Sequence, residues 1–125
     1  GLSKITKTGA VMGTPVFMPR QQAMNFKYAK PEVDVWAAAA SYYNMLTGTF
    51  PKNFRPGMNV WQIIVTESAV PIRDRSPAIP QSMAAVIDKA LRETPSIGYQ
   101  TAADFRKHLV NALPENVKNA VKGVL

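Results

Sequence analysis

The chain has 125 residues, which is room for one domain with a single modest core. Its residues are 46% hydrophobic and 18% charged, a balance typical of a globular protein and not of a disordered one. Cysteine is absent, which excludes disulfide bonds and thiolate metal sites, and no apolar run approaches the roughly 20 residues of a membrane span. No secretory signal pattern is visible at the N-terminus, so we expect a cytoplasmic protein with no membrane segment.

The chain is strongly basic, with a formal net charge of +7 at pH 7 and a pI near 9.9. Such a balance could signal an anionic partner. The basic residues are dispersed, however, and no aromatic side chains are interleaved with them. A solvated basic surface is therefore favoured over a specific nucleic-acid site, and a basic helical nucleic-acid binder stays as the weakest alternative.

The first 19 residues contain Gly, Ser, Thr, Lys and Pro without apolar periodicity, which indicates a loop. Ser3, Thr6 and Thr8 lie among lysines in this loop and are candidate phosphorylation sites. A hydroxyl-rich loop that is never modified is an equal alternative. A short helix is predicted from Arg20 to Met24.

The most apolar stretch runs from Glu32 to Thr47 and has small or apolar side chains on nearly every face. Pro31 suits a first helical turn, and the carboxylates of Glu32 and Asp34 suit the positive end of the helix dipole. Gly48 is predicted to be the C-cap residue, because glycine tolerates the left-handed conformation there. A helix that is apolar all round is normally buried, so this one is predicted to be the core.

Further helices are predicted downstream. Asn59 is expected to cap a helix that ends near Glu67 and buries Trp61, Ile64 and Val65. Three prolines between residues 71 and 80 predict an extended connection. Helices are then expected over residues 82–93, 102–113 (capped by Thr101) and 115–124. No strand pattern is visible, so the predicted fold class is all-α.

Two motifs carry a resemblance to a known family. Gly13 to Pro19 (GTPVFMP), followed by Asp34-Val35-Trp36, resembles the end of the activation segment and the next helix of eukaryotic-type Ser/Thr protein kinases, as found in bacteria. LTGTFP and KALRETP follow in the family's order, and Gly1-Leu2-Ser3-Lys4 resembles the end of a DFG-L-S-K magnesium loop. The resemblance implies the helical portion of the kinase large lobe, preceded by an activation-segment loop. It divides the chain into an activation segment (1–19), large-lobe helices (20–113) and a C-terminal helical tail (114–125).

The resemblance also implies roles for single residues. Thr14 matches the Thr that contacts the catalytic Asp and Lys, although a turn residue before a proline is the other interpretation. Val16, Phe17 and Met18 match the floor that receives the substrate residue after the phosphoacceptor. These four residues are the predicted substrate-binding site.

Asp34 and Trp36 are expected to be structural anchors of the central helix. Asp34 matches a buried Asp that holds the backbone of the catalytic loop in the family. The alternative is a helix-start Asp that the dipole favours, and neither interpretation makes the residue catalytic.

The sequence departs from the family at a buried salt bridge between the activation segment and the last large-lobe helices. The family's Glu position is Gln21 here and its Arg position is Gly98. Joint loss is physically coherent, because removing one partner of a buried pair costs about 3–5 kcal/mol while replacing both can be near neutral. A one-residue misalignment is the alternative. In either case the substrate floor is predicted to be held less firmly than in relatives.

Phosphoryl transfer needs a phosphate cradle, a Lys–Glu pair, magnesium ligands and a catalytic Asp. The 125 residues contain no Gly-rich loop, no V-A-I-K strand and no H-R-D motif. We therefore expect no catalytic residue, metal or cofactor in this chain, and MgATP for an intact parent. The leading hypothesis is a C-terminal lobe fragment of a Ser/Thr protein kinase that is inactive alone. A pseudokinase-like interaction scaffold is the alternative.

The missing catalytic loop and its preceding helix would leave part of the central helix without cover. We expect this exposed flank to contain Val35, Ala39, Tyr42 and Met45, and to drive association. The predicted partners are a protein substrate, the rest of the kinase domain and, through the exposed core, a second copy.

Overall fold

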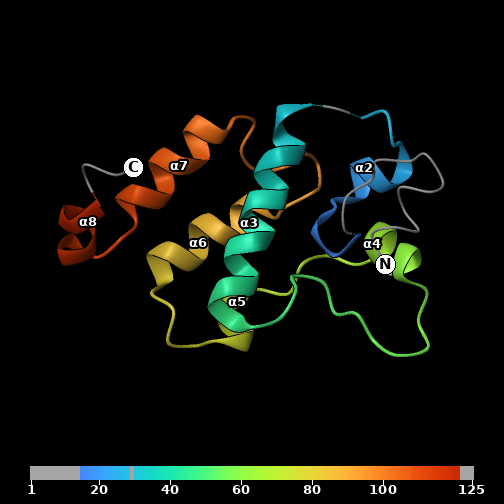
Figure 1. Cartoon of the computed structure of the whole chain (residues 1–125), viewed down its shortest axis with the longest axis horizontal. Helices are drawn as coiled ribbons and strands as arrows, with labels where there is room; N and C mark the ends of the chain where they lie inside the picture. Colours follow the sequence, from blue (N-terminus) through green and yellow to red (C-terminus); the bar gives the residue numbers. More distant parts are fainter. Residues whose placement is uncertain (1–14, 29, 122–125) are drawn as a thin grey trace.

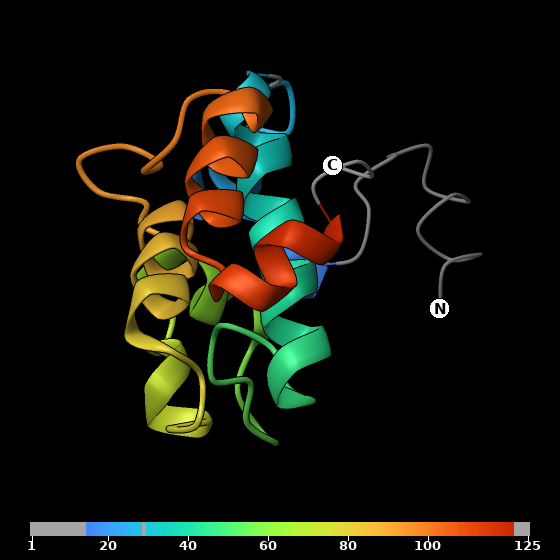
Figure 2. The same ribbon diagram turned by 90° about the vertical axis from the view of Figure 1, so that its left-hand side faces the viewer.

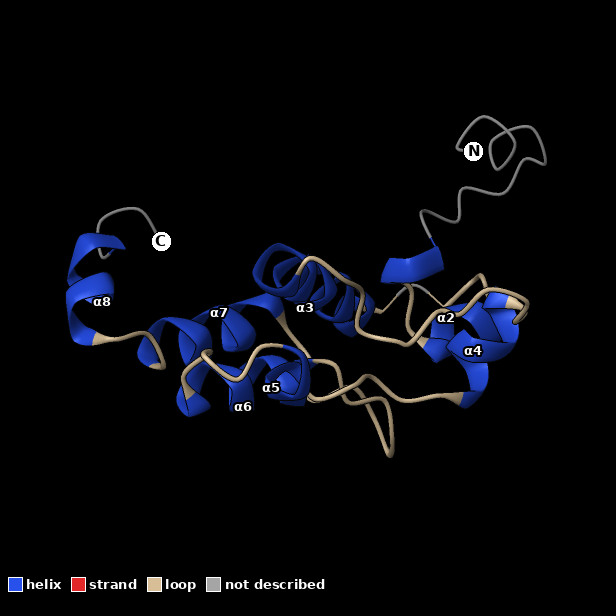
Figure 3. Cartoon of the chain, turned by 90° about the horizontal axis from the view of Figure 1, so that it is seen from below, coloured by secondary structure: helices blue, strands red, loops and turns tan. Residues whose placement is uncertain are grey.

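The computed structural model describes residues 15–28 and 30–121, and every regular element within these ranges is a helix (Figures 1 and 3). The all-α fold class predicted from the sequence is confirmed for this part of the chain. The elements, in chain order, are a 3-10 turn η1 (Pro15–Phe17), α2 (Arg20–Met24), α3 (Pro31–Thr47), α4 (Val60–Thr66), α5 (Ile72–Arg75), α6 (Gln81–Ala90), α7 (Ala102–Asn111) and α8 (Glu115–Val121).

Helix α3 is the centre of the fold and contacts η1, α5, α6 and α7 (Figure 1). Pro31 occupies its first turn, and Gly48 ends it with a φ of 76°, a left-handed conformation that glycine adopts without strain. Both ends are as the sequence predicts. The core-facing side chains of α3 are fully or almost fully buried: Val35, Trp36, Ala39, Ala40 and Tyr43.

Helices α6 and α7 cover one side of α3. Ile87, Ala90 and Leu91 at the end of α6 join Phe105 of α7 in the same core cluster as the central helix. Seen from the α8 end, α7 lies beside α3 and α6, and α8 lies in front, nearest the viewer (Figure 2). The Thr101 side chain accepts a hydrogen bond from the Asp104 backbone N–H at 3.1 Å, which caps α7 as predicted.

Helices α2 and α4 pack against each other beyond the other side of α3 (Figure 1). Asn59 caps α4 by accepting from the N–H groups of Trp61 and Gln62. The prediction that α4 buries Trp61 is wrong, because Ile63 and Ile64 are the residues that face inward. Trp61 lies at the surface and meets the ring of Phe26 edge-on, with centroids 5.9 Å apart.

The connection between α4 and α6 contains one helical turn, α5, where the prolines predict extended chain throughout. Asp88 of α6 explains this turn, since its carboxylate accepts the Ile72 backbone N–H at 3.0 Å. Ile72 is thereby fixed in the core, fully buried beneath α3. The partner comes from a helix 16 residues away, so the local sequence does not reveal the turn.

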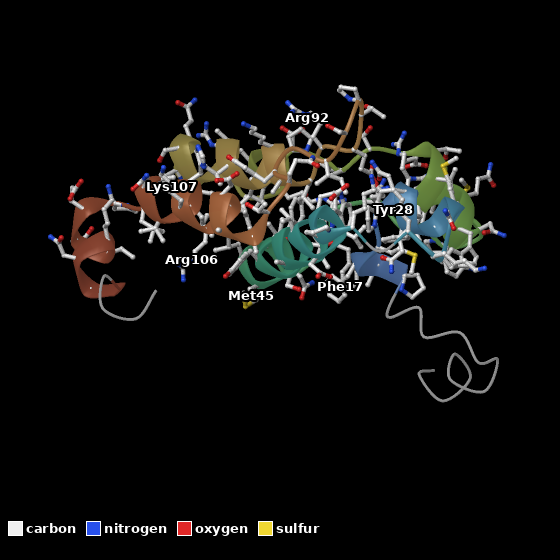
Figure 4. All side chains as sticks on the ribbon, turned by 90° about the horizontal axis from the view of Figure 1, so that it is seen from above. Phe17, Tyr28, Met45, Arg92, Arg106 and Lys107 are labelled. Carbon is white, nitrogen blue, oxygen red and sulfur yellow. The ribbon has the colours of Figure 1, made fainter. Side chains whose placement is uncertain are left out.

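The prediction of an exposed flank on α3 is right for two of its four residues. Val35 and Ala39 are buried, because α6 and its neighbours cover them. Tyr42 and Met45 are exposed, Met45 by 70%, and Figure 4 places Met45 at the edge of the molecule. Among the described residues no helix is both long and apolar enough to cross a bilayer.

Candidate functional site

The described part of the predicted activation segment, residues 15–19, continues directly into α2, and together they form a short stretch from Pro15 to Met24. The Met18 N–H donates to the Pro15 carbonyl at 3.1 Å and closes the η1 turn. Met18 is 2% exposed, whereas Val16 and Phe17 are partly exposed. Val16 and Phe17 are therefore partly accessible to solvent, while the Met18 side chain is buried in the protein.

Aromatic side chains join this segment to the loop after α3. Phe17 meets Phe50 edge-on with ring centroids 5.6 Å apart, and Phe50 meets Phe54 at 6.3 Å. Edge-to-face pairs of this kind contribute about 0.5–1.5 kcal/mol beyond their buried area. Phe17 is thus both a partly exposed surface residue and a packing contact (Figure 4).

Four of the predicted site residues lie outside the described residues: Ser3, Thr6, Thr8 and Thr14. Their predicted roles as phosphorylation sites and substrate contact stay predictions.

The two predicted anchors of α3 have different environments. Trp36 is fully buried, and its indole N–H donates to the Leu91 carbonyl at 3.0 Å, which ties α3 to the end of α6. Asp34 is exposed in the first turn of α3. It lines a pocket of about 440 Å³ between α3 and the turn before it, together with Tyr28 and Lys30. An exposed carboxylate at a helix start is favoured by the dipole without a buried partner, and the predicted anchoring role of Asp34 stays a prediction.

A buried carboxylate that the sequence did not single out holds α2 in place. Glu93, just after α6, is 5% exposed. Its Oε2 accepts the Arg20 backbone N–H at 2.7 Å, and its Oε1 accepts the Arg20 Nε at 3.2 Å. The Glu93 backbone carbonyl accepts the Gln21 side-chain amide at 2.8 Å. Three hydrogen bonds therefore connect the first turn of α2 to one residue.

Lys52 completes this cluster from the loop after α3. The Lys52 side chain is 1% exposed, and its Nζ donates to Glu93 Oε2 at 2.8 Å and to the Ile64 carbonyl at 2.6 Å. Burial lowers the pKa of Lys52 from its ordinary value, and the attraction of Glu93 opposes that shift. The ammonium also lies 5.4 Å from the centre of the Trp36 ring. We call Arg20, Lys52 and Glu93 the Glu93 network.

These contacts correct the prediction of a loosely held substrate floor. Gln21 and Gly98 do not pair with each other, but Arg20 and Gln21 are bonded to Glu93 instead. Gly98 is closed to a side chain, because a Cβ built there would lie 1.8 Å from the Lys89 carbonyl oxygen. The segment is tied to the region after α6 by different residues from those the family pattern uses.

No local signal in the sequence reveals this network. Arg20 and Glu93 are 73 residues apart and Lys52 and Glu93 are 41 apart, and each lies beside several other charged or polar residues. Lysine and glutamate are almost never fully buried unless they are paired, so each would be read as a surface residue. A joint search for compensating charges near Gln21 and Gly98 could have proposed Arg20 and Glu93.

The described carboxylates do not form a magnesium site. Residues 15–28 and 30–121 hold no group of three or more His, Asp or Glu side chains that could bind a metal. Several carboxylates already have protein partners: Glu32 accepts from the Tyr28 hydroxyl, Glu67 pairs with Arg55, and Glu93 pairs with Arg20 and Lys52.

The described residues form a buried central helix, α3, with η1 and α2 on one side and the amphipathic helices α6 and α7 on the other, an all-α arrangement that is consistent with a helical part of a protein kinase. No family model matches the chain. Curated relatives do match, and they are bacterial protein kinases. Most of them are named serine/threonine-protein kinases, and one, MasK of Myxococcus xanthus, is named a tyrosine-protein kinase and is 28% identical over 115 residues.

Three of these relatives cover most of the chain. The serine/threonine-protein kinase PknB of Mycobacterium tuberculosis (strain ATCC 25618 / H37Rv) is 32% identical over 108 residues, which are 86% of this chain and 17% of the relative. PknB of Mycolicibacterium smegmatis is 30% identical over 120 residues, or 96% of this chain and 19% of the relative. The probable serine/threonine-protein kinase CE0033 of Corynebacterium efficiens is 33% identical over 111 residues, or 86% and 17%. The resemblance to bacterial Ser/Thr kinases is confirmed, and the chain spans less than a fifth of these relatives' length.

Proposed function

We propose that this chain is the C-terminal lobe part of a Ser/Thr protein kinase, whose intact form transfers the γ-phosphate of MgATP to Ser or Thr of a protein. In this proposal residues 1–19 are the activation segment, residues 20–113 are the large-lobe scaffold and residues 114–125 are a helical tail. The similarity of 30–33% to named kinases, extending over at least 86% of the chain, is the observation that carries the proposal.

The substrate floor is proposed to lie at Val16, Phe17 and Met18, next to Thr14. The packing of this stretch supports the proposal, since a floor must keep its shape while a peptide binds. Met18 is buried beneath it and the Glu93 network holds the following helix. Phosphorylation of Ser3, Thr6 or Thr8 would add negative charge to the basic loop that precedes this floor.

The 125-residue chain alone is proposed to be inactive. It contains no Gly-rich loop, strand lysine or H-R-D motif, and its described carboxylates do not form a metal site. Binding and orientation of MgATP would therefore depend on parts of a kinase domain that these residues do not supply.

Titration calorimetry with MgATP and a radiolabelled phosphate-transfer assay test both parts of this proposal. We expect no binding at micromolar MgATP and no transfer by the 125-residue chain. A longer protein that contains this chain and an upstream kinase portion should bind MgATP and phosphorylate a generic basic protein substrate. Micromolar binding by the short chain would refute its inactivity, and an inactive longer protein would refute the kinase assignment.

A scaffold that only engages partners is the second candidate. Its support from the sequence was the paired change at Gln21 and Gly98. The Glu93 network weakens that support, because the segment is bonded to the rest of the fold despite both changes. An intact upstream H-R-D, D-F-G and strand Lys would favour the enzyme, and degenerate motifs would favour the scaffold.

The exposed flank of α3 is proposed to contact the rest of the kinase domain. It forms one wall of an apolar groove of about 300 Å³ whose lining includes Tyr42, Met45, Leu109 and Val117. Without that cover, the 125-residue chain is expected to associate with itself through these side chains. A monodisperse monomer in light scattering would contradict this expectation.

A further inference from the structure

The start of α2 and the region after α6 are joined by charges in a buried setting. The side chains of Lys52 and Glu93 are 1% and 2% exposed, and that of Arg20 is 21% exposed. Surface pairs between Lys or Arg and a carboxylate contribute little, whereas breaking a buried pair leaves an uncompensated charge in a low-dielectric site. The Lys52–Glu93 pair in this cluster is a buried pair.

We propose that the Glu93 network is a latch that positions the substrate floor, with its charges reversed relative to the family pattern. In that pattern the activation segment supplies the carboxylate and the region before the last large-lobe helix supplies the arginine. Here α2, which directly follows the predicted activation segment, supplies the cation, Arg20, and the region after α6 supplies the carboxylate, Glu93. The inference that the positioned segment receives a substrate rests on the proposed function; the inference that it is latched does not.

The latch connects four parts of the chain. Arg20 belongs to α2 and Glu93 follows α6, while Lys52 belongs to the loop after α3. The Lys52 ammonium also bonds to the carbonyl of Ile64, and the Arg20 guanidinium bonds to the carbonyl of Glu67 at 3.2 Å. Both carbonyls lie at the C-terminal end of α4, where cations are favoured. A change at Glu93 therefore reaches α2 and α4 together.

The reversed polarity follows from the backbone around residue 98. No side chain fits at Gly98, because its Cβ would collide with the carbonyl of Lys89. An arginine at that position is therefore excluded by the present backbone. The cation has to come from elsewhere, and Arg20, adjacent to Gln21, has both its backbone N–H and its Nε bonded to Glu93.

A positioning latch and a merely stabilising core pair predict different behaviour. A latch holds residues 15–25 locally, so its loss should open that segment while the helices around α3 stay closed. A core pair contributes to global stability, so its loss should affect all protected amides alike. Native-state hydrogen exchange of the 125-residue chain distinguishes the two. The reporters in the segment are the N–H groups of Met18, Ala23 and Asn25, which are bonded within it.

The first variant is Arg20→Gln, which removes the cation and leaves the buried Lys52–Glu93 pair intact. Arg92→Gln is the matched control, because Arg92 is an exposed arginine next to Glu93 and its loss changes the net charge equally (Figure 4). In Arg20→Gln we expect exchange in the segment to accelerate about tenfold or more, the ratio expected for a lost hydrogen bond to a charged group. The amides of Leu91 and Phe105 should be unaffected, and the control should match the wild type throughout.

The second test uses Glu93→Gln alone and together with Lys52→Met. The single change leaves Lys52 buried without its carboxylate and is expected to speed exchange everywhere. The double change removes the buried pair, so exchange at Leu91 and Phe105 should return toward the wild-type rate. Exchange of the segment should stay fast, because Arg20 has still lost its partner.

Two outcomes would overturn the latch. One is a segment whose exchange in both Arg20→Gln and Glu93→Gln stays at the rate of the Arg92→Gln control. The other is a double variant that restores the segment and the core equally, which would make the network a stability pair only. Neither outcome depends on phosphate transfer, so a failed latch and a failed kinase assignment are separable.

Discussion

Gly98 offers the sharpest test of the fold, because its backbone passes directly against the end of α6. A Cβ added at Gly98 would lie 1.8 Å from the Lys89 carbonyl oxygen, 2.7 Å from its carbonyl carbon and 2.8 Å from its Cγ. The first two atoms are backbone and cannot rotate away. We therefore predict that Gly98→Ala destabilises the chain through steric overlap, although the residue has no left-handed φ that would require glycine.

The size of the stability loss follows from the backbone displacement that a Cβ at residue 98 requires. Real Cβ atoms keep about 3.0 Å or more from such neighbours, so the two backbones must separate by about 1.2 Å. The Lys89 carbonyl also accepts the Arg92 N–H at 3.1 Å, in the turn that carries Leu91 and Glu93. Overpacking costs about 1–3 kcal/mol and a strained hydrogen bond about 1 kcal/mol more, so we expect about 2–4 kcal/mol.

Urea unfolding followed by tryptophan fluorescence measures this loss, since Trp36 is fully buried and bonds to Leu91 near the altered turn. Gly57→Ala is the control. Gly57 has a φ of 81° and no atom within 4 Å of its would-be Cβ, so its substitution costs only backbone strain of about 1–2 kcal/mol. Gly98→Ala should therefore be the more destabilising of the two.

A second test introduces the family's residues at positions 21 and 98. Gln21→Glu combined with Gly98→Arg should be less stable than the wild type, because the arginine cannot enter at residue 98 and the new carboxylate would lie near Glu93. A double variant at least as stable as the wild type, or a Gly98→Ala variant within about 0.5 kcal/mol of it, would refute the reasoning.

Three further predictions address the core, the buried lysine and the exposed flank. Trp36→Phe should lower the free energy of unfolding by about 2–4 kcal/mol, because it leaves the Leu91 carbonyl unpaired and opens a cavity. Urea unfolding followed by circular dichroism measures this loss, and the control Trp61→Phe should lose less because the Trp61 ring is partly exposed. Burial lowers the pKa of Lys52 in the folded state, so the wild type should gain stability relative to Lys52→Met as pH rises from that lowered pKa toward the ordinary value of 10.5. A difference in unfolding free energy between the two proteins that stays constant over this pH range would contradict the prediction. Met45→Glu should reduce self-association in light scattering without lowering stability, because Met45 is 70% exposed, and unchanged association would exclude this flank as the contact.

The helices were predictable because their signals are local. Pro31 and Gly48 delimit α3, Asn59 and Thr101 cap α4 and α7, and each of these residues acts through its own backbone or its near neighbours. The apolar content of α3 likewise predicts a buried central helix. The turn at Ile72 and the surface position of Trp61 were missed, because the first depends on Asp88 in another helix and the second on the direction in which α4 faces α2.

The candidate site was predictable only in part. The GTPVFMP stretch is recognisable by order and spacing, and the burial of Met18 beneath a partly exposed Phe17 is compatible with a floor. What holds the stretch in place was predicted wrongly. The match of Gln21 and Gly98 to the family positions predicts a missing pair, but the burial of Lys52 and Glu93, on which the replacement contacts depend, is not visible in the sequence.

The sequence by itself determined the family resemblance, the all-α class, both ends of α3 and the starts of α4 and α7, since these depend on residue order and on contacts within a few positions. The predicted C-terminal ends of α6 and α7 were too late, because α6 ends at Ala90 and α7 at Asn111. Only the tertiary structure decided that Lys52 and Glu93 are buried, that Arg20 binds Glu93 and that residue 98 has to be glycine. The physical reason is that the cost of a charge or a Cβ depends on what surrounds it. Those surroundings are assembled from segments up to 73 residues apart, and they exist only in the folded chain.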